Sequence, residues 1–195
     1  MALSNASKAG TTIFLGVVQF TMAIILAEVY YPGYSVGQRT VSDLGATCTS
    51  GTCVVEQPSA TIINLSVMLL GVLVLTGAFY IQRAFHWKPA SGLIALAGVG
   101  AIGVGIFPET AGVLHGLFSL IAFLSSGLSA VVLARFQRKP LFYFSIILGS
   151  ITLVALVLYL GGFDLGLGQG GMERMIIYPS LLWGIGFGGN LMSAG

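Results

Sequence analysis

Charged residues are scarce in this sequence. It contains 8 Lys and Arg and 6 Asp and Glu in 195 residues, so 7% of the chain is charged, whereas an ordinary soluble domain is about 25% charged. Apolar residues make up 56% of the chain, and the mean hydropathy is +0.97. A soluble domain of this length cannot bury so much apolar surface. The composition therefore predicts an integral membrane protein.

Basic clusters and histidine are lacking as well. The net charge is +2, and no run of Lys and Arg alternates with aromatic residues, so we expect no nucleic-acid partner. A hydrolytic metal centre needs several His or carboxylate ligands. The two histidines, His86 and His115, lie on opposite sides of the membrane in the topology derived below. We therefore expect no metal and no cofactor, and a three-histidine zinc centre is excluded.

What the sequence does contain is long apolar runs. A transmembrane helix takes about 17–25 mostly apolar residues, and six stretches qualify: 12–31, 62–81, 91–107, 111–133, 141–160 and 173–192. The first run is too long for a signal peptide and has no A-x-A-like cleavage site. The sequence predicts an all-α integral membrane protein, one domain over residues 1–195. Its six transmembrane helices form a bundle with an ordered outer loop between the first two.

Lys and Arg gather on one side of these spans. Six of the eight precede the first span or fall in the connections 82–90 and 134–140, and cytoplasmic loops carry such an excess. We therefore expect both termini to be cytoplasmic and the protein to lie in the cell membrane. All six acidic residues map to the outer half, where they serve either a functional surface or loop solvation: Glu28, Asp43, Glu56, Glu109, Asp164 and Glu173.

The two cysteines lie five residues apart in the outer segment TCTSGTC. A pair this close outside the cytoplasm can form a disulfide, so we expect Cys48 and Cys53 to clip the loop. Small residues recur every four positions at Ala97, Ala101 and Gly105, which lets helices approach closely in lipid. This pattern favours packing within the chain over a dimer interface, and a homo-oligomer stays open.

The span 111–133 carries a polar stripe. At 100° per residue one line of the helix is occupied by His115, Ser119, Ala122, Ser126 and Ser129. An ionisable residue in a span usually faces the interior and is paired, so we expect His115 to face the interior and pair with Glu173 or Glu109. A different reading makes Glu109 a cap of this helix at the positive end of its dipole.

The outer ends of the spans hold the remaining candidates. Arg174 is expected to pair with Asp43, Glu109 or a phosphate, and Glu173 with His115 or Arg39. If these ends converge, one outward pocket is surrounded by seven residues: Glu28, Arg39, Asp43, Glu109, His115, Glu173 and Arg174. The candidate ligand-binding set is Glu28, Arg39, Asp43, His115, Arg174 and Tyr178, and the catalytic candidates are His115, Glu109, Glu173 and Asp43.

Four stretches of the chain resemble a prokaryotic family of six-span membrane proteins known as domain of unknown function 998. They are TVSDLGA (40–46), NLSVMLLG (64–71), GIFPET followed by His115 (105–115), and GMERMIIYPSLLWGIGF (171–187). The resemblance implies the six-helix bundle and implies that Asp43, Glu109, His115, Glu173 and Arg174 are recurring positions. It implies no activity, and the cysteine loop is not part of the pattern.

Two functions fit these observations best. The first is binding or carrying of a lipid or small amphiphile in an outward polar pocket over an apolar bundle. The second is an enzyme acting on a lipid head group, with His115 and a carboxylate as acid and base, although no G-x-S-x-G serine elbow is present. Transport of a small molecule is a weaker alternative, because no span is clearly broken at mid-membrane. Membrane lipid is the expected surrounding partner.

Overall fold

The computed structural model describes residues 3–193. It contains six long helices, each long and apolar enough to cross a membrane, so the prediction of six spans is confirmed. The helices are α1 (Asn5–Tyr30), α2 (Ser59–Phe85), α3 (Lys88–Ile106), α4 (Val113–Leu133), α5 (Leu141–Leu160) and α6 (Gly168–Ser193). Short 3-10 turns follow or precede them: η1 (Ser42–Leu44), η2 (Glu109–Ala111) and η3 (Ala134–Phe136).

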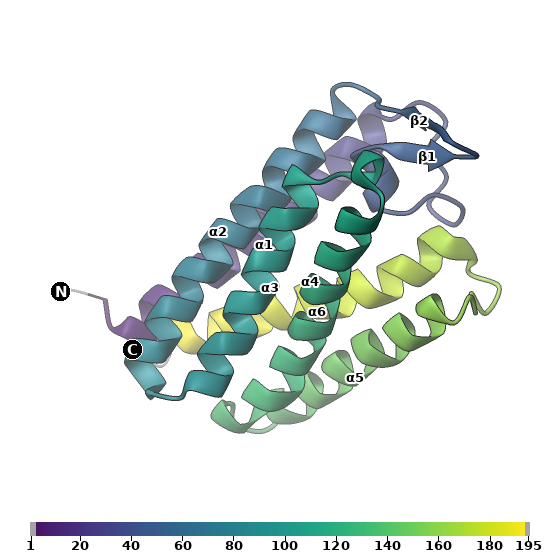
Figure 1. The fold of residues 1–195 in the computed structure, drawn as a ribbon. Helices are drawn as coiled ribbons and strands as arrows, with labels where there is room; N and C mark the ends of the chain where they lie inside the picture. The colour runs from purple at the N-terminus through teal and green to yellow at the C-terminus, as the bar shows by residue number, and fades with distance from the viewer. Residues whose placement is uncertain (1–2, 194–195) are drawn as a thin grey trace.

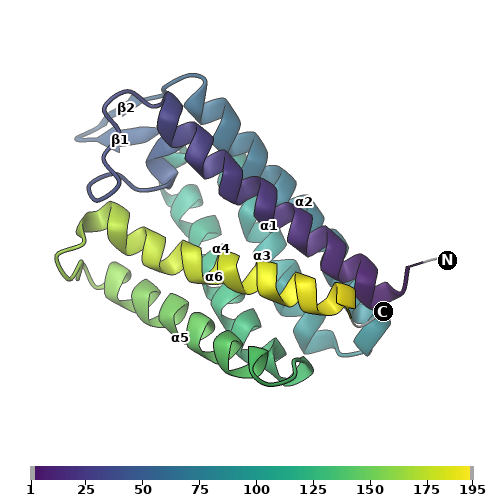
Figure 2. The same ribbon diagram turned by 180° about the vertical axis from the view of Figure 1, so that it is seen from behind.

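The helices run up and down and close into a ring. Each helix packs against the next one in sequence, and α6 returns to pack against α1, as the two opposite views show (Figures 1 and 2). Small residues allow the closest approaches. A Cβ on Gly71 would lie 2.6 Å from the Gly98 carbonyl oxygen, and one on Gly10 would lie 2.5 Å from that of Gly188. These glycines therefore set the spacing of α2 against α3 and of α1 against α6.

The predicted stripe of small residues also packs inside the chain. A Cβ on Gly105 would meet the side chain of Met68 at 2.4 Å, and Ala101 is buried. Both residues therefore pack against other helices of the same chain. This is the arrangement that the sequence favours.

The span boundaries differ from the predicted ones where polar or glycine residues extend a helix. α1 begins at Asn5 rather than residue 12, because the Ser4 hydroxyl accepts the Ser7 backbone N–H and caps it. α6 begins at Gly168 rather than residue 173. The prediction counted apolar residues alone, so it missed these polar first turns, whereas the bounds of α5 agree with the predicted 141–160.

Residues 31–58 form a cap over one end of the bundle. The cap contains η1 and a two-stranded antiparallel sheet, β1 (Thr47–Thr49) and β2 (Thr52–Val54), in which Cys48 faces Cys53. The two cysteines are joined in a disulfide, which confirms the predicted clip. The sheet lies at the end of the molecule opposite to both termini (Figure 1).

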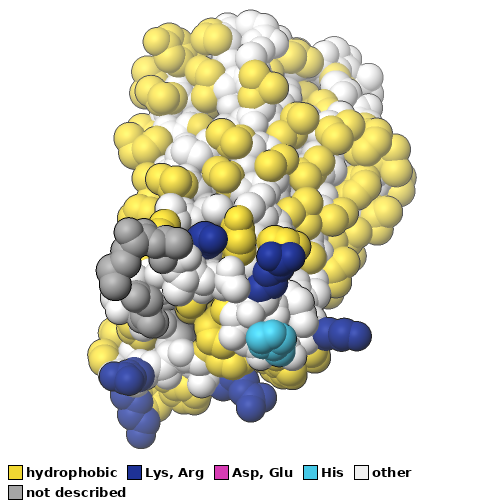
Figure 3. Space-filling model, turned by 90° about the vertical axis from the view of Figure 1, so that its left-hand side faces the viewer, with side chains coloured by type: hydrophobic (Ala, Val, Ile, Leu, Met, Phe, Trp, Pro, Cys, Tyr) yellow, Lys and Arg dark blue, Asp and Glu magenta, His cyan; other side chains and the backbone are white. Residues whose placement is uncertain are grey.

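Six of the eight basic residues lie at the end that carries the termini. Lys8 is near the start of α1, Arg83 is in the last turn of α2, Lys88 begins α3, and Arg135 lies in η3. Figure 3 shows this end with Lys, Arg and one His, and no Asp or Glu is visible on the described part of that face. The six acidic residues belong to the cap and to helix ends beside it. The structure therefore has two ends of opposite charge.

This segregation generates a topology prediction. We expect the basic end to face the cytoplasm, because cytoplasmic ends of membrane proteins hold the excess of Lys and Arg. In a background where Cys48 and Cys53 are serine, Lys88→Cys and Arg138→Cys should resist a membrane-impermeant thiol reagent, whereas Thr52→Cys should react. Labelling of position 88 or 138 from outside intact cells, with position 52 protected, would reverse the orientation.

Candidate functional site

Arg174, in the second turn of α6, fastens the cap to the bundle. Its side chain is buried, and its Nη2 lies 2.7 Å from Glu28 Oε1 on α1 and 2.6 Å from the Tyr34 hydroxyl, to which it donates. Its Nη1 donates to the backbone carbonyls of Val36 and Arg39, each at 2.9 Å. A guanidinium offers five N–H donors in one plane. One side chain therefore joins α1, α6 and the turn at the start of the cap.

Glu173, the preceding residue, fastens the cap at a second place. Its carboxylate is buried and accepts the backbone N–H of Val41 and, at 2.8 Å, the hydroxyl of Ser42. Buried backbone N–H groups need a partner, and residue 41 lies just before η1, where no sheet or α-helix supplies one. The expected partners of these two residues were wrong: Arg174 pairs with Glu28, and Glu173 holds the cap backbone.

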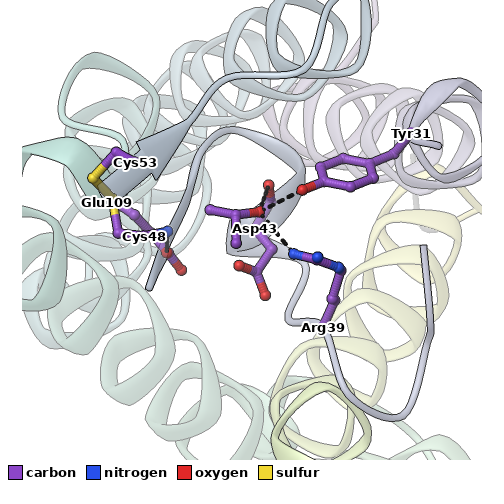
Figure 4. The surroundings of a disulfide bond; sticks show 7 residues. Tyr31, Arg39, Asp43, Cys48, Cys53 and Glu109 are labelled. Atoms are coloured by element: carbon purple, nitrogen blue, oxygen red, sulfur yellow. Dashed lines mark hydrogen bonds between the residues drawn. A yellow bond between two sulfur atoms is a disulfide. The ribbon is translucent and has the colours of Figure 1, made fainter. Parts of the chain in front are cut away.

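Asp43 and Arg39 order the cap itself. Asp43 accepts the Thr40 backbone N–H at 2.7 Å and the Thr40 hydroxyl at 3.0 Å, and its own backbone N–H donates back to that hydroxyl oxygen. Arg39 Nη1 donates to Thr47 Oγ1 at 3.2 Å, and its guanidinium lies over the ring of Tyr31. Figure 4 shows Arg39 and Tyr31 pointing toward the same side chain of the cap. Asp43 and Arg39 thus make contacts within the cap.

Glu109 links the disulfide hairpin to the turn between α3 and α4. Its Oε2 accepts the Cys48 backbone N–H at 3.4 Å, and its Oε1 lies 3.5 Å from the Thr40 hydroxyl, so Glu109 lies beside the disulfide hairpin (Figure 4). Gly112, with φ of 55°, separates η2 from α4 and is the N-cap residue of α4. No side chain caps this helix by a hydrogen bond. The reading of Glu109 as a cap of the fourth helix is therefore wrong.

His115 faces the interior of the bundle, as its stripe predicts. Its Nδ1 lies 2.8 Å from the carbonyl oxygen of Phe107, the C-cap residue just after α3. The last carbonyls of a helix lack intrahelical partners, so this contact satisfies one of them. Within residues 3–193 no carboxylate oxygen lies within 4.0 Å of His115. The expected pairing of His115 with Glu173 or Glu109 is wrong.

A cavity of about 150 Å³ lies beneath the cap in the centre of the bundle. Its walls are mostly apolar and come from α1, α2, α3, α4 and α6. Val41 and Ser42 of the cap line its outer part, where Asn64 and His115 also lie. The stripe on α4 forms one wall through His115, Ser119, Ala122 and Ser126. Glu173 on α6 accepts hydrogen bonds from Val41 and Ser42, so it also holds the segment that covers the cavity.

Two polar atoms beside this cavity have no partner in the part of the chain that the structure describes. They are the Ser119 hydroxyl and the indole Nε1 of Trp183, and both atoms are buried. About one turn nearer the cap than Trp183, the Ser180 hydroxyl contacts those of Ser126 at 3.1 Å and Thr152 at 3.0 Å. Among these polar groups, the three hydroxyls around Ser180 are thus hydrogen-bonded to one another, whereas the Ser119 and Trp183 atoms are unpaired within the described residues.

Of the predicted ligand-binding residues, His115 lines the cavity, and five do not: Glu28, Arg39, Asp43, Arg174 and Tyr178. Tyr178 is exposed. Sequence reasoning missed Ser42, Asn64 and Trp183 as lining residues. Asn64 could have been noticed as a polar residue within an apolar run, whereas Ser42 and Trp183 are placed by the fold of the cap and by the ring closure of α6 against α1.

The chain matches the model of a family described as a protein of unknown function, DUF998, over residues 14–189. The protein belongs to the DUF998 family. The match includes part or all of each of the six helices of the DUF998 protein. Each of the four stretches that carried the resemblance contributes residues to the lining of the cavity. No curated protein and no solved structure matches the chain.

The contacts of Arg174 generate a stability prediction. Arg174→Ala leaves Glu28 without its ion-pair partner and two cap carbonyls without donors, and removing one member of a buried ion pair typically costs about 3–5 kcal/mol. Arg39→Ala, which removes a half-buried guanidinium at the side of the cap, should cost about 1 kcal/mol or less. The measurement is the free energy of unfolding of each purified variant in mixed micelles, compared with that of the wild-type protein. Equal losses for the two variants would contradict the role of Arg174.

Glu109 generates a prediction of pH dependence. Burial, and then the nearby Asp43 carboxylate, raise the pKa of the Glu109 carboxyl to about 7. The folded protein therefore keeps a proton that the unfolded chain loses near pH 4.5, so the contribution of Glu109 to stability falls as the pH rises through about 7.

Melting temperatures between pH 5 and pH 8 measure this effect. Glu109→Gln should reduce the fall in melting temperature with rising pH, because the amide oxygen still accepts the Cys48 N–H and the amide carries no charge. Glu56→Gln, a change elsewhere in the cap, should leave the profile as it is. A wild-type profile that rises over this range, or one that Glu109→Gln leaves unaltered, would show that Glu109 is ionised in the folded protein.

Proposed function

We propose that the protein binds a small amphiphile inside its helical bundle, in the cavity beneath the cap. The observation that carries this proposal is the cavity itself. Apolar side chains of five helices surround it, and polar groups of Ser42, Asn64 and His115 lie at its outer part. Ligand sites of proteins have this composition, with apolar walls and a few polar groups that fix orientation.

The size of the cavity limits the ligand. An apolar cavity of about 150 Å³ holds a molecule of roughly the size of benzene. A membrane lipid with two acyl chains is far larger, so of the two predicted ligand classes the geometry favours the small amphiphile. The charged residues of the cap then act indirectly, because Glu173 holds Val41 and Ser42 over the cavity.

Binding fits the geometry better than the other two functions do. An enzyme acting on a head group would need an acid or base beside His115, whereas within the described residues its nearest hydrogen-bond partner is a backbone carbonyl. A transporter usually has a span interrupted at the site, whereas α6 continues through Pro179. We therefore propose a binder or carrier whose cap faces the outside of the cell.

The proposal is tested by filling the cavity. Ala101 is buried on α3 and lines the cavity, so Ala101→Leu adds three carbon atoms to the space for the ligand. Val99→Phe adds four carbon atoms to the same helix at an exposed position, and it serves as the matched control.

Small molecules extracted from protein purified in mild detergent are compared by mass spectrometry. The wild-type protein and Val99→Phe should carry the same small amphiphile, and Ala101→Leu should have lost most of it while staying monodisperse. A wild-type protein that carries no small molecule would contradict the proposal, as would one whose bound molecules are unchanged by Ala101→Leu.

A further inference from the structure

The hydrogen bond of His115 fixes which ring nitrogen is free. The partner of Nδ1 is the Phe107 carbonyl oxygen at 2.8 Å. A carbonyl oxygen accepts hydrogen bonds and cannot donate them, so the proton of the neutral ring must be on Nδ1. In that tautomer Nε2 has a lone pair and accepts a hydrogen bond. His115 therefore offers a free acceptor at the cavity that it lines.

The described lining of the cavity has no charged side chain that could pair with an ion. Among the described residues that line it there is no Asp, Glu, Lys or Arg. An ion placed among these apolar walls would lose its hydration without gaining a partner of opposite charge, which is strongly unfavourable. The ligand must therefore be neutral, and fatty acids, phosphates and ammonium compounds do not fit.

The unpaired polar atoms point to a ligand rather than to an apolar filling. Within residues 3–193, neither the Nε1 of Trp183, which is 6% exposed, nor the Ser119 hydroxyl one turn below His115 has a hydrogen-bond partner. Buried polar atoms in native proteins are nearly always paired. The unpaired Ser119 hydroxyl, on the same wall as His115, is the expected state of a site that is completed by a bound molecule.

We infer that the ligand is a neutral molecule of roughly benzene size, with a hydroxyl group that donates a hydrogen bond to Nε2 of His115. This inference rests on the proposed function and adds the chemical class of the ligand. The Ser119 hydroxyl, next along the same wall, donates to the ligand oxygen, and the apolar body lies between α1, α2, α3 and α6. A small phenol or alcohol has this chemistry.

The test compares three probes of similar size: phenol, toluene and benzoate. Phenol has the donor, toluene lacks it, and benzoate is charged. His115→Asn keeps an N–H donor near the position of Nδ1 but removes the acceptor at Nε2. His86→Asn, a change of the exposed histidine at the opposite end of the bundle, is the matched control.

Affinities are measured on the full-length protein in one detergent, from the fluorescence of Trp183 in a Trp87→Phe background. Partition of each probe into the micelles is common to all variants and cancels in ratios. We expect the ratio of phenol to toluene affinity to fall roughly tenfold in His115→Asn, as for the loss of one hydrogen bond. It should be unchanged in His86→Asn, and benzoate should not bind.

The outcomes separate the inference from the proposed function. If toluene and phenol bind and their ratio is the same in the wild-type protein and His115→Asn, the cavity binds small molecules and the role of His115 is refuted. Benzoate binding as tight as that of phenol would refute the restriction to neutral ligands. If neither phenol nor toluene binds the wild-type protein, the proposed function itself fails.

Discussion

The cap half of the molecule depends on how one turn of α6 satisfies the backbone of the cap. The cap has two short strands and one 3-10 turn, so most of its backbone groups lack regular partners. Arg174 donates to its carbonyls, and Glu173 accepts one of its N–H groups. Donor and acceptor side chains at adjacent positions point about 100° apart on a helix, so the two residues hold the cap at separate points.

This attachment couples the cap to the cavity. Val41 and Ser42, which Glu173 holds, are the cap residues that line the cavity, and α6 supplies Trp183 and Ser180 to its inner part. Ser180 is fixed in turn by Ser126 of α4 and Thr152 of α5. A movement of α6 would therefore alter the outer cover and the inner wall of the cavity together. The charged residues at the cap end thus support the cavity without lining it.

Sequence reasoning succeeded where the information is local. The spans follow from the length of apolar runs, the disulfide from the spacing of Cys48 and Cys53, and the inward stripe of α4 from helical periodicity. It failed for the partners of His115, Glu173 and Arg174. The periodicity gives the direction of a side chain but not the group that meets it, and several of these partners are backbone atoms, among them the Phe107 carbonyl, the Val41 N–H and the Val36 carbonyl. Backbone partners of this kind have no residue-type signal in a sequence.

Hydrogen exchange of the cap backbone tests the central claim most directly. If Glu173 and Arg174 hold the cap against the bundle, the Val41 amide should exchange slowly in the purified protein, although it lies outside any α-helix or strand. Residues 161–167, an exposed connection between α5 and α6, provide the comparison within the same molecule. The account predicts exchange at Val41 at least roughly a hundredfold slower than in that connection, as expected when exchange requires a cooperative opening. Equal rates in the two segments would show that the cap is not held by α6 and would contradict the account.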